Sequence, residues 1–241
     1  MRALLLDLDG TILGLDLASF VPAYTRAAAE YFADVIPPAR FIKELFRATS
    51  AMVADDDPQA TNADVFARHF FPAIGKPAEE LLPLFDRFYQ EEFPKLKVEA
   101  TLKPESHQLV NAAKGLGLRL VLATNPVFPR AAVEERLRWA GLDSGEFELI
   151  TTYEDMHFCK PNPNYYREIL ALIGLEAAEC LMAGNDSLED MVAGDVGIAT
   201  YLVTDHVIMH PKGRKPDRSG TLAELVAILP ELLKGRGIMV S

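Results

Sequence analysis

Two carboxylates near the start of the chain are the first residues that could do chemistry. They stand in the segment DLDGT, residues 7–11, at the end of an apolar run that reads as a buried strand. A regular strand would point Asp7 and Asp9 to the same face, so they can take different tasks only if the chain turns there. Gly10 permits that turn, because glycine accepts backbone angles that other residues avoid. Taken alone, the segment is also compatible with a simple capped turn.

Three later segments add polar groups near the ends of predicted strands. Thr124 and Asn125 follow the run LRLVLA, Lys160 stands before a proline in a loop, and Asp186 follows ECLMAGN. Asp190 lies four residues after Asp186, a spacing that puts both carboxylates on one face at the N-terminus of a helix. Taken singly, these are typical of a polar turn, a solvated charge and a helix cap. Only their combination indicates a site.

The combination of carboxylates with a lysine and a hydroxyl indicates phosphate chemistry at a divalent cation. Several carboxylates in one place repel each other and any phosphate, so local cations must reverse the field. Asp7, Asp186 and Asp190 can supply oxygen ligands, and so few carboxylates suit Mg²⁺ better than Ca²⁺. Zinc is disfavoured, since no histidine or cysteine stands among these residues. Mg²⁺ and Lys160 would then neutralise the phosphate of a substrate.

These residues can meet only if the elements that carry them form one sheet. Helix-like and strand-like patterns alternate from residue 102 onward, which indicates βαβ units on a parallel sheet with helices on both faces. In such sheets ligands bind outside the carboxyl ends of the strands, where the polar segments stand. The predicted fold class is therefore a doubly wound α/β core with a mostly parallel sheet.

Residues 15–98 follow a different pattern. Their apolar positions recur three and four apart, and no convincing strand interrupts them. We therefore expect an all-helical domain at 15–98, inserted into a catalytic core formed by residues 1–14 and 99–241. Several aromatic side chains of the insert are expected to fill its own core: Phe20, Tyr24, Phe41 and Phe46.

The composition limits the compartment and the partners. The 241 residues include 24 Lys and Arg against 35 Asp and Glu, and the net charge of −11 would repel nucleic acid. Two cysteines without paired spacing, and no membrane-spanning or signal-like apolar stretch, predict a cytoplasmic protein without disulfides or membrane attachment. The basic residues 210–220 are expected to be a solvated connection. A small phosphorylated molecule is the expected partner, and the oligomeric state stays open.

Four segments, in this order, resemble the motifs of the haloacid dehalogenase-like hydrolases, most of whose members are phosphatases. LLLDLDGTI is similar to the family's first motif, LATNP to its second, CKPNPNYYREIL to its third and AGNDSLEDMVAG to its acidic fourth. The resemblance implies the family's core and a mobile helical cap that closes over it and selects the substrate. The cap carries no such motif, so the residues that choose the substrate stay unassigned.

The resemblance also implies a role for each residue of the site. Asp7 would be the nucleophile and Asp9 the general acid and base, while Lys160 would anchor the nucleophile and the phosphate. Thr124 and Asn125 would hold the phosphoryl oxygens. Mg²⁺ would be bound by Asp7, the Asp9 carbonyl and Asp186, with Asp190 as a further ligand or a supporting partner.

The predicted function is a Mg²⁺-dependent phosphomonoester hydrolase that acts on a small phosphorylated metabolite through an aspartyl-phosphate intermediate. A phosphomutase of the same family, which would return the phosphoryl group to a sugar phosphate, stays open. A haloacid dehalogenase needs neither a metal nor a general acid, so Asp9 and the pair Asp186 and Asp190 count against it. A non-catalytic interaction module is the last alternative, although the chain has Asp7, Asp9, Lys160 and Asp186.

Overall fold

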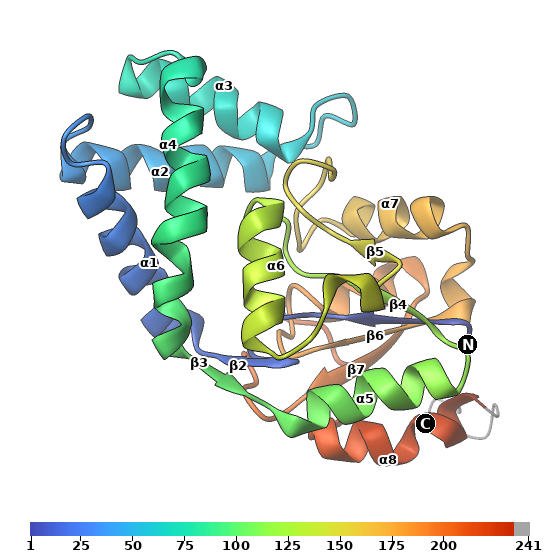
Figure 1. Cartoon of the computed structure of the whole chain (residues 1–241). Helices are drawn as coiled ribbons and strands as arrows, with labels where there is room; N and C mark the ends of the chain where they lie inside the picture. Colours follow the sequence, from blue (N-terminus) through green and yellow to red (C-terminus); the bar gives the residue numbers. More distant parts are fainter. Residues whose placement is uncertain (234–241) are drawn as a thin grey trace.

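Six parallel strands form the central sheet of the chain (Figure 1). The computed structural model describes residues 1–233, apart from the side chains of residues 98 and 99. In spatial order the strands are β5 (Leu149–Ile150), β4 (Arg119–Leu122), β1 (Ala3–Leu6), β6 (Cys180–Gly184), β7 (Ala199–Val203) and β8 (Arg218–Gly220). The helices and 3₁₀ turns around them are α5 (Pro104–Gly115), α6 (Arg130–Trp139), α7 (Pro163–Ile173), α8 (Leu222–Leu233), η2 (Ser144–Glu146), η3 (Ala177–Glu179) and η4 (Met191–Val196).

The central strand β1 is buried on both faces, and its side chains alternate between two apolar clusters. Leu4 and Leu6 pack in the cluster that includes residues of α5, α6 and α8. Ala3 and Leu5 pack in the cluster that includes residues of α7 and η4. Helices on both faces explain why the strand reads as an unbroken apolar run. The predicted doubly wound α/β fold is confirmed.

The order of the strands explains why the polar segments meet. In the register, Leu6 stands beside Leu122 of β4 and Ala183 of β6. The chain builds the β4 side of the sheet first and then crosses to the β6 side, so β1 lies at the point where the strand order reverses. Ligands of open parallel sheets bind at such a switch point, outside the carboxyl ends of the strands. The segments after β1, β4 and β6 therefore converge there.

The helical segment lies between two short strands, β2 (Leu13–Leu15) and β3 (Ala100–Leu102), which pair antiparallel with Gly14 opposite Thr101. Leu15 was expected in the helical insert but is the last residue of β2, since a three-residue strand is too short to show a period. The elements between the two strands are α1 (Leu17–Tyr31), α2 (Pro38–Ala54), α3 (Asn62–Ile74), α4 (Ala78–Glu91) and the 3₁₀ helix η1 (Phe93–Glu99).

Stacked and edge-on aromatic rings hold these four helices together. The rings of Phe32 and Phe41 stack with centroids 5.0 Å apart, and Phe70 meets Phe41 edge-on at 5.8 Å. Such pairs add roughly 0.5–1.5 kcal/mol each beyond the burial of their area. The expectation that Phe20 and Phe41 are core residues is confirmed, since both are fully buried. Phe46 is 47% exposed, so it does not belong to that core.

The N-terminus of α3 docks on loops of the sheet domain. The backbone N–H groups of Asn62 and Ala63 donate to the carbonyls of Met156 and Tyr153, both at 2.8 Å. Beside them, Met52, Ala60 and Val65 form an apolar cluster with Cys159 of the sheet domain. The helical segment thus contacts the sheet domain here as well as through its two strands, and the rings of Phe20 and Phe93 pack on Trp139 of α6.

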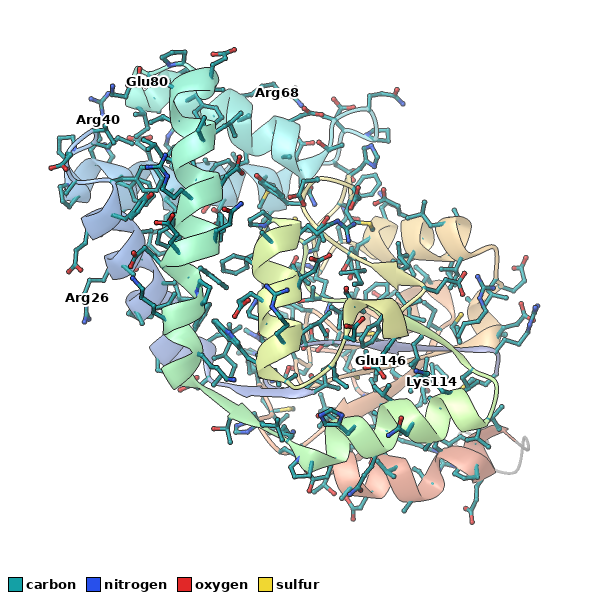
Figure 2. All side chains as sticks on the ribbon, in the orientation of Figure 1. Arg26, Arg40, Arg68, Glu80, Lys114 and Glu146 are labelled. Carbon is teal, nitrogen blue, oxygen red and sulfur yellow. The ribbon has the colours of Figure 1, made fainter. Side chains whose placement is uncertain are left out.

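Charged side chains lie mainly on the outside of the molecule. Figure 2 shows the labelled side chains of Arg26, Arg40 and Arg68 at the periphery, and all three are exposed. Within residues 1–233, no helix combines the length and the apolar character needed to cross a bilayer. The charges that are buried instead are concentrated at the carboxyl end of the sheet.

Candidate active site

Asp7 follows β1 directly and is held from two sides. Its Oδ2 accepts a hydrogen bond from the Thr11 hydroxyl at 2.9 Å, and its Oδ1 accepts one from the Lys160 ammonium at 3.0 Å. The turn after it needs a glycine: Gly10 has φ of +79°, and a Cβ there would lie 2.2 Å from Nδ2 of Asn185. The expectation that Gly10 allows the chain to turn is confirmed.

Lys160 lies at the centre of the site and is only 1% exposed. Its ammonium group donates to Oδ1 of Asp7 and, at 2.5 Å, to Oδ1 of Asp190. Burial alone would lower the pKa of Lys160, but the carboxylates of Asp190 and Asp7 raise it well above its usual value. The side chain is therefore a fixed positive charge that bridges the first and fourth motifs.

Asp190 is buried against the end of β6. Its Oδ2 accepts the backbone N–H of Asp186 at 2.9 Å, and a Cβ on Gly184 would lie 2.2 Å from that oxygen, so glycine makes room for it. Burial, with repulsion from Asp7, raises the pKa of Asp190 to about 7 although Lys160 opposes the rise. Both oxygens of Asp190 are thus already engaged by protein donors.

Asp186 makes a different set of contacts from Asp190. Its Oδ1 accepts the N–H groups of Leu188 at 2.7 Å and Glu189 at 2.9 Å, and its Oδ2 lies 3.1 Å from Nε2 of His210. The expected helix after Asp186 is wrong. One turn closes with the Asp190 N–H on the Asp186 carbonyl at 3.0 Å, and the chain then continues as the 3₁₀ helix η4.

Glycine and local capping explain why that helix does not form. The carboxylate of Asp186 takes N–H groups of its own turn, which competes with helical pairing. Gly194 and Gly197 follow soon after, and glycine costs about 1 kcal/mol relative to alanine inside a helix. The spacing of four therefore brings the backbones of the two aspartates together, while their carboxylates have different partners.

Thr124 and Asn125 follow β4, and Asn125 contacts Lys160. The Asn125 amide clamps the backbone of Lys160: its Oδ1 accepts the N–H at 3.2 Å, and its Nδ2 donates to the carbonyl at 3.4 Å and to Glu189 at 3.0 Å. The carbonyl of Thr124 accepts the Tyr165 hydroxyl at 2.9 Å. The structure thus brings together all four segments that the sequence singled out.

Asp9 faces another partner, Arg136 of α6, with which it forms an ion pair. The Arg136 side chain is 1% exposed, and its guanidinium lies 4.4 Å from the ring centroid of Phe128. Within residues 1–233, Oδ1 of Asp9 and Nη2 of Arg136 are buried without a hydrogen-bond partner. Burial and repulsion from Asp7, opposed by Arg136, raise the pKa of Asp9 to about 6.

Sequence reasoning missed Arg136, although a signal was present. In RAAVEERLRW it stands between Val133 and Leu137 on the stripe of the helix that faces the core, where an arginine is unusual. It also missed Thr11, inside the first motif, and His210. The latter lies in the stretch that was expected to be a solvated connection, and its contact with Asp186 shows that this expectation was incomplete.

The donor set of the site fits Mg²⁺. The site contains five carboxylates, those of Asp7, Asp9, Asp186, Glu189 and Asp190, and two cations, those of Lys160 and Arg136. Counted formally, the carboxylates exceed the cations by three. Within the described residues no three His, Cys, Asp or Glu side chains converge into a ready-made cage. Mg²⁺ keeps several waters and takes one or two carboxylates, which Asp7 and Asp186 can provide.

Comparison with known proteins identifies the family. Residues 1–195 match the family described as haloacid dehalogenase-like hydrolase. The chain is 25% identical over 231 residues to the plasmid phosphoglycolate phosphatase of Cupriavidus necator, covering 96% of this chain and 92% of the relative. Its match to YhcW of Bacillus subtilis is 34% identical over 107 residues, 44% of this chain and 45% of that relative.

A solved structure supports the same fold. The 2-haloacid dehalogenase from Pseudomonas syringae pv. Tomato DC3000 has a TM-score of 0.64 at 20% identity, over 98% of this chain and 99% of that chain. At that identity the likeness concerns the fold alone. The family match covers most of the chain, including the segments that form the site. The chain therefore belongs to the haloacid dehalogenase-like hydrolases.

Proposed function

We propose that the chain is a phosphatase, a Mg²⁺-dependent phosphomonoester hydrolase that acts on a small phosphorylated metabolite with Asp7 as its nucleophile. The observation that carries the proposal is the buried Lys160 ammonium, which contacts Asp7 and Asp190 at once. A fixed cation beside a carboxylate can hold a phosphate dianion against that carboxylate. Relatives matched over more than nine-tenths of this chain are named phosphoglycolate phosphatases.

In the first step a carboxylate oxygen of Asp7 forms a bond to phosphorus, and the bond from phosphorus to the substrate's alcohol oxygen breaks. Asp9 gives its proton to the departing alcohol oxygen. Lys160 and the groups of Thr124 and Asn125 stabilise the charge that develops on the phosphoryl oxygens. The product of this step is an aspartyl phosphate on Asp7.

In the second step water attacks the phosphorus and the bond to Asp7 breaks, which releases inorganic phosphate. Asp9, now a carboxylate, takes the proton of the attacking water, so both Asp7 and Asp9 return to their starting states. One residue thus serves as the acid of the first step and the base of the second. The balance over both steps is hydrolysis of one ester bond.

Arg136 is proposed as the positioning residue for Asp9. It holds one carboxylate oxygen in an ion pair, while Oδ1 of Asp9 has no partner within the described residues. That free oxygen is the one we assign to proton transfer. The stacking of Arg136 on Phe128 fixes the guanidinium in turn.

We assign the cation to Asp7, Asp186 and the carbonyl of Asp9, with Asp190 as the supporting acid that fixes Lys160. Bound Mg²⁺ would supply positive charge for the phosphoryl oxygens. The protein's own part is to hold Asp186 by two N–H groups and Asp7 by Thr11, so that both carboxylates keep their orientation.

We further propose that residues 15–98 form a cap domain on a catalytic core of residues 1–14 and 99–241. The division is supported by the way the chain passes between the two parts, through the paired strands β2 and β3. Closure of the cap would exclude bulk water from the aspartyl phosphate.

We propose the cytoplasm as the compartment. Both cysteines of the chain, Cys159 and Cys180, are buried and unpaired. Free buried thiols are compatible with a reducing environment.

A panel of phosphorylated metabolites, assayed with Mg²⁺ for free phosphate, tests the proposal. Phosphate release from at least one small monoester, lost on chelation, is the expected result. The same preparation should release no halide from 2-chloropropionate and should not isomerise sugar phosphates. Halide release or phosphoryl return to a sugar without free phosphate would assign the chain to one of the rival activities.

A further inference from the structure

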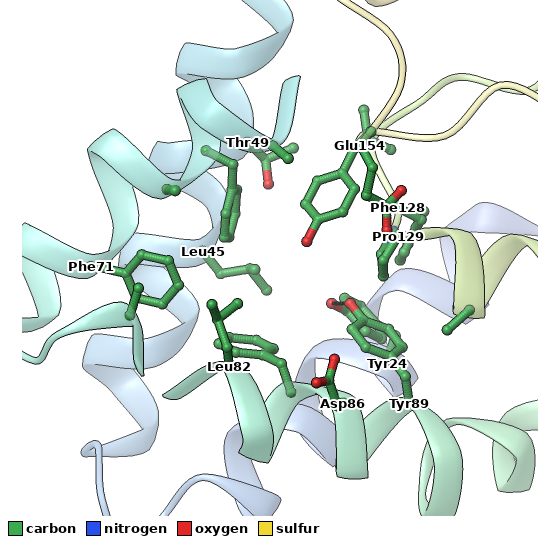
Figure 3. A pocket seen from close by; sticks show the side chains of 18 of the residues that line it. Tyr24, Leu45, Thr49, Phe71, Leu82, Asp86, Tyr89, Phe128, Pro129 and Glu154 are labelled. Carbon is green, nitrogen blue, oxygen red and sulfur yellow. Dashed lines mark hydrogen bonds between the residues drawn. The ribbon is translucent and has the colours of Figure 1, made fainter. Parts of the chain in front are cut away.

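An apolar cavity of about 460 Å³ lies between the helices α1–α4 and two segments of the sheet domain, the loop that leads into α6 with the first turn of that helix, and residues 153–154 (Figure 3). Its volume falls in the range of small-molecule pockets, roughly 300–1,000 Å³. Aromatic rings dominate the walls: Tyr24, Phe66, Phe85, Tyr89, Phe128 and Tyr153.

The charged groups of the cavity are all acidic. Asp64, Asp86 and Glu154 line it, and none of the described lining residues is Lys, Arg or His. The carboxylate of Asp64 is engaged by Thr61, and that of Glu154 accepts the Arg130 N–H. Asp86 is exposed on α4, and Figure 3 shows its carboxylate beside Tyr24 and Tyr89 at the cavity.

The cavity and the reaction centre share a wall at Phe128. Phe128 lines the cavity and lies against Arg136, which pairs with Asp9. Phe128 also follows Asn125 by only three residues, so the wall of the cavity and the border of Lys160 are parts of one loop.

We infer that this cavity receives the alcohol part of the substrate, and that this part is uncharged and largely apolar; the cavity has room for a substituted benzene ring. The inference rests on the proposed phosphatase function. A substrate carboxylate in this cavity would lose its hydration without gaining a cationic partner, and the acidic side chains of the lining would repel it. The chain therefore selects against acidic esters. Phosphoglycolate, from which a relative takes its name, is such an ester.

A matched pair of esters tests the inference. The esters 3-phenylpropyl phosphate and 3-(4-carboxyphenyl)propyl phosphate share the same primary alcohol as leaving group and differ by one carboxylate at the far end. With Mg²⁺, we expect kcat/KM for the neutral ester to exceed that for the acidic one by at least about tenfold. Equal values of kcat/KM for the two esters, or a preference for the acidic one, would overturn the inference. Release of phosphate from either ester would still support the proposed function.

Two variants locate the preference in the cavity. Ala67→Trp on α3 should fill it and lower kcat/KM for 3-phenylpropyl phosphate, with little change for acetyl phosphate, which needs no such space. Asp86→Lys should shift the preference toward the acidic ester, whereas Glu91→Lys, an exposed charge change on the same helix outside the cavity, should not. The same shift in both lysine variants would contradict the assignment.

Two negative results remain distinguishable. If no phosphate ester is hydrolysed at all, the proposed function fails, and the inference fails with it. If acetyl phosphate is hydrolysed and Ala67→Trp leaves 3-phenylpropyl phosphate unaffected, only the inference fails. Binding of 4-phenylbutylphosphonate, a non-hydrolysable analogue, should weaken in Ala67→Trp as well, and unchanged binding would also overturn the inference.

Discussion

The carboxyl end of the sheet and the cavity between the helices and the sheet domain differ in their polar groups. At the sheet, buried charges are paired one by one: Lys160 with Asp7 and Asp190, and Arg136 with Asp9. In the cavity, the walls are aromatic and aliphatic, and the acids stand at the edge. The residues proposed for catalysis therefore lie in short segments at strand ends, whereas the cavity proposed to select the substrate is lined mainly by helix faces that carry no motif.

Loss of the nucleophile should produce the largest difference between the two regions. Asp7→Asn keeps the shape and the hydrogen-bond acceptor for Lys160, but an amide cannot attack phosphorus. We expect turnover to fall by at least about 10⁴-fold, because no neighbouring group can replace the carboxylate. Binding of 4-phenylbutylphosphonate should persist, since the cavity is untouched. Phosphate release above 1% of wild type would refute the assignment of Asp7.

Removal of Mg²⁺ should have the second-largest effect on activity. Chelation should abolish phosphate release, and added Mg²⁺ should restore it. Asp186→Asn keeps an acceptor for the N–H groups of Leu188 and Glu189, so the fold should survive, but the Mg²⁺ concentration for half activity should rise by about 10–100-fold. Asp195→Asn, an exposed acid in η4, is the control. Full activity after exhaustive chelation would contradict the account.

Changes to the ion pair of Asp9 and Arg136 should affect both catalysis and the stability of the fold. Arg136→Met should reduce kcat by about 10²–10⁴-fold through misplacement of Asp9, with a smaller change in KM. It should also lower the free energy of unfolding by about 3 kcal/mol, because it leaves a buried carboxylate unpaired. Arg138→Met, an exposed arginine on the same helix, should do neither.

A double-mutant cycle separates positioning from general stability. In an Asp9→Asn background, Arg136→Met should cost little further activity, since the residue that it positions no longer transfers protons. Arg136→Lys should restore part of the kcat of Arg136→Met. Equal losses in both backgrounds would mean that Arg136 acts independently of Asp9.

The smallest effect is expected at the docking contact of the helical segment. Asp56 accepts hydrogen bonds from Asn162 at 2.9 Å and Asn164 at 3.1 Å. Asp56→Ala should raise KM by about two- to tenfold with kcat nearly constant, because an exposed contact contributes about 0.5–1.5 kcal/mol. Asp57→Ala, whose carboxylate accepts a hydrogen bond from Gln59 in its own loop, is the control. Solution scattering should show a larger radius for the Asp56 variant without ligand.

Much of the core could be predicted because its signals are local. An apolar run that ends in DLDGT specifies both a buried strand and the polar edge that follows it, and Thr124, Lys160 and Asp186 stand near comparable positions. The contacts that were missed join segments far apart in sequence. Arg136 reaches Asp9 across 127 residues, and His210 reaches Asp186 from a loop whose charge indicated only solvation.

The helical segment shows the limit of periodicity. The pattern identifies buried faces, and Phe20 and Phe41 are indeed core residues. It cannot tell a ring that fills a core from one that lines a cavity. Phe46 was expected in the core but is 47% exposed and lines the cavity, whereas Tyr24 is buried in the core as expected and lines the cavity as well. Whether a ring fills the core or lines a cavity depends on how helices from distant segments pack against each other, and the periodicity of a single helix does not show this.

The covalent intermediate on Asp7 is the most direct test of the account. In Asp9→Asn an aryl phosphate should still react, because its leaving group scarcely needs a proton, whereas activation of water for the second step is lost. Rapid acid quench and intact-mass measurement should then find one added phosphoryl group on the Asp9→Asn protein, absent when Asp7 is also changed to Asn. An adduct that survives the change of Asp7, or unaltered turnover by Asp9→Asn, would contradict the assigned roles.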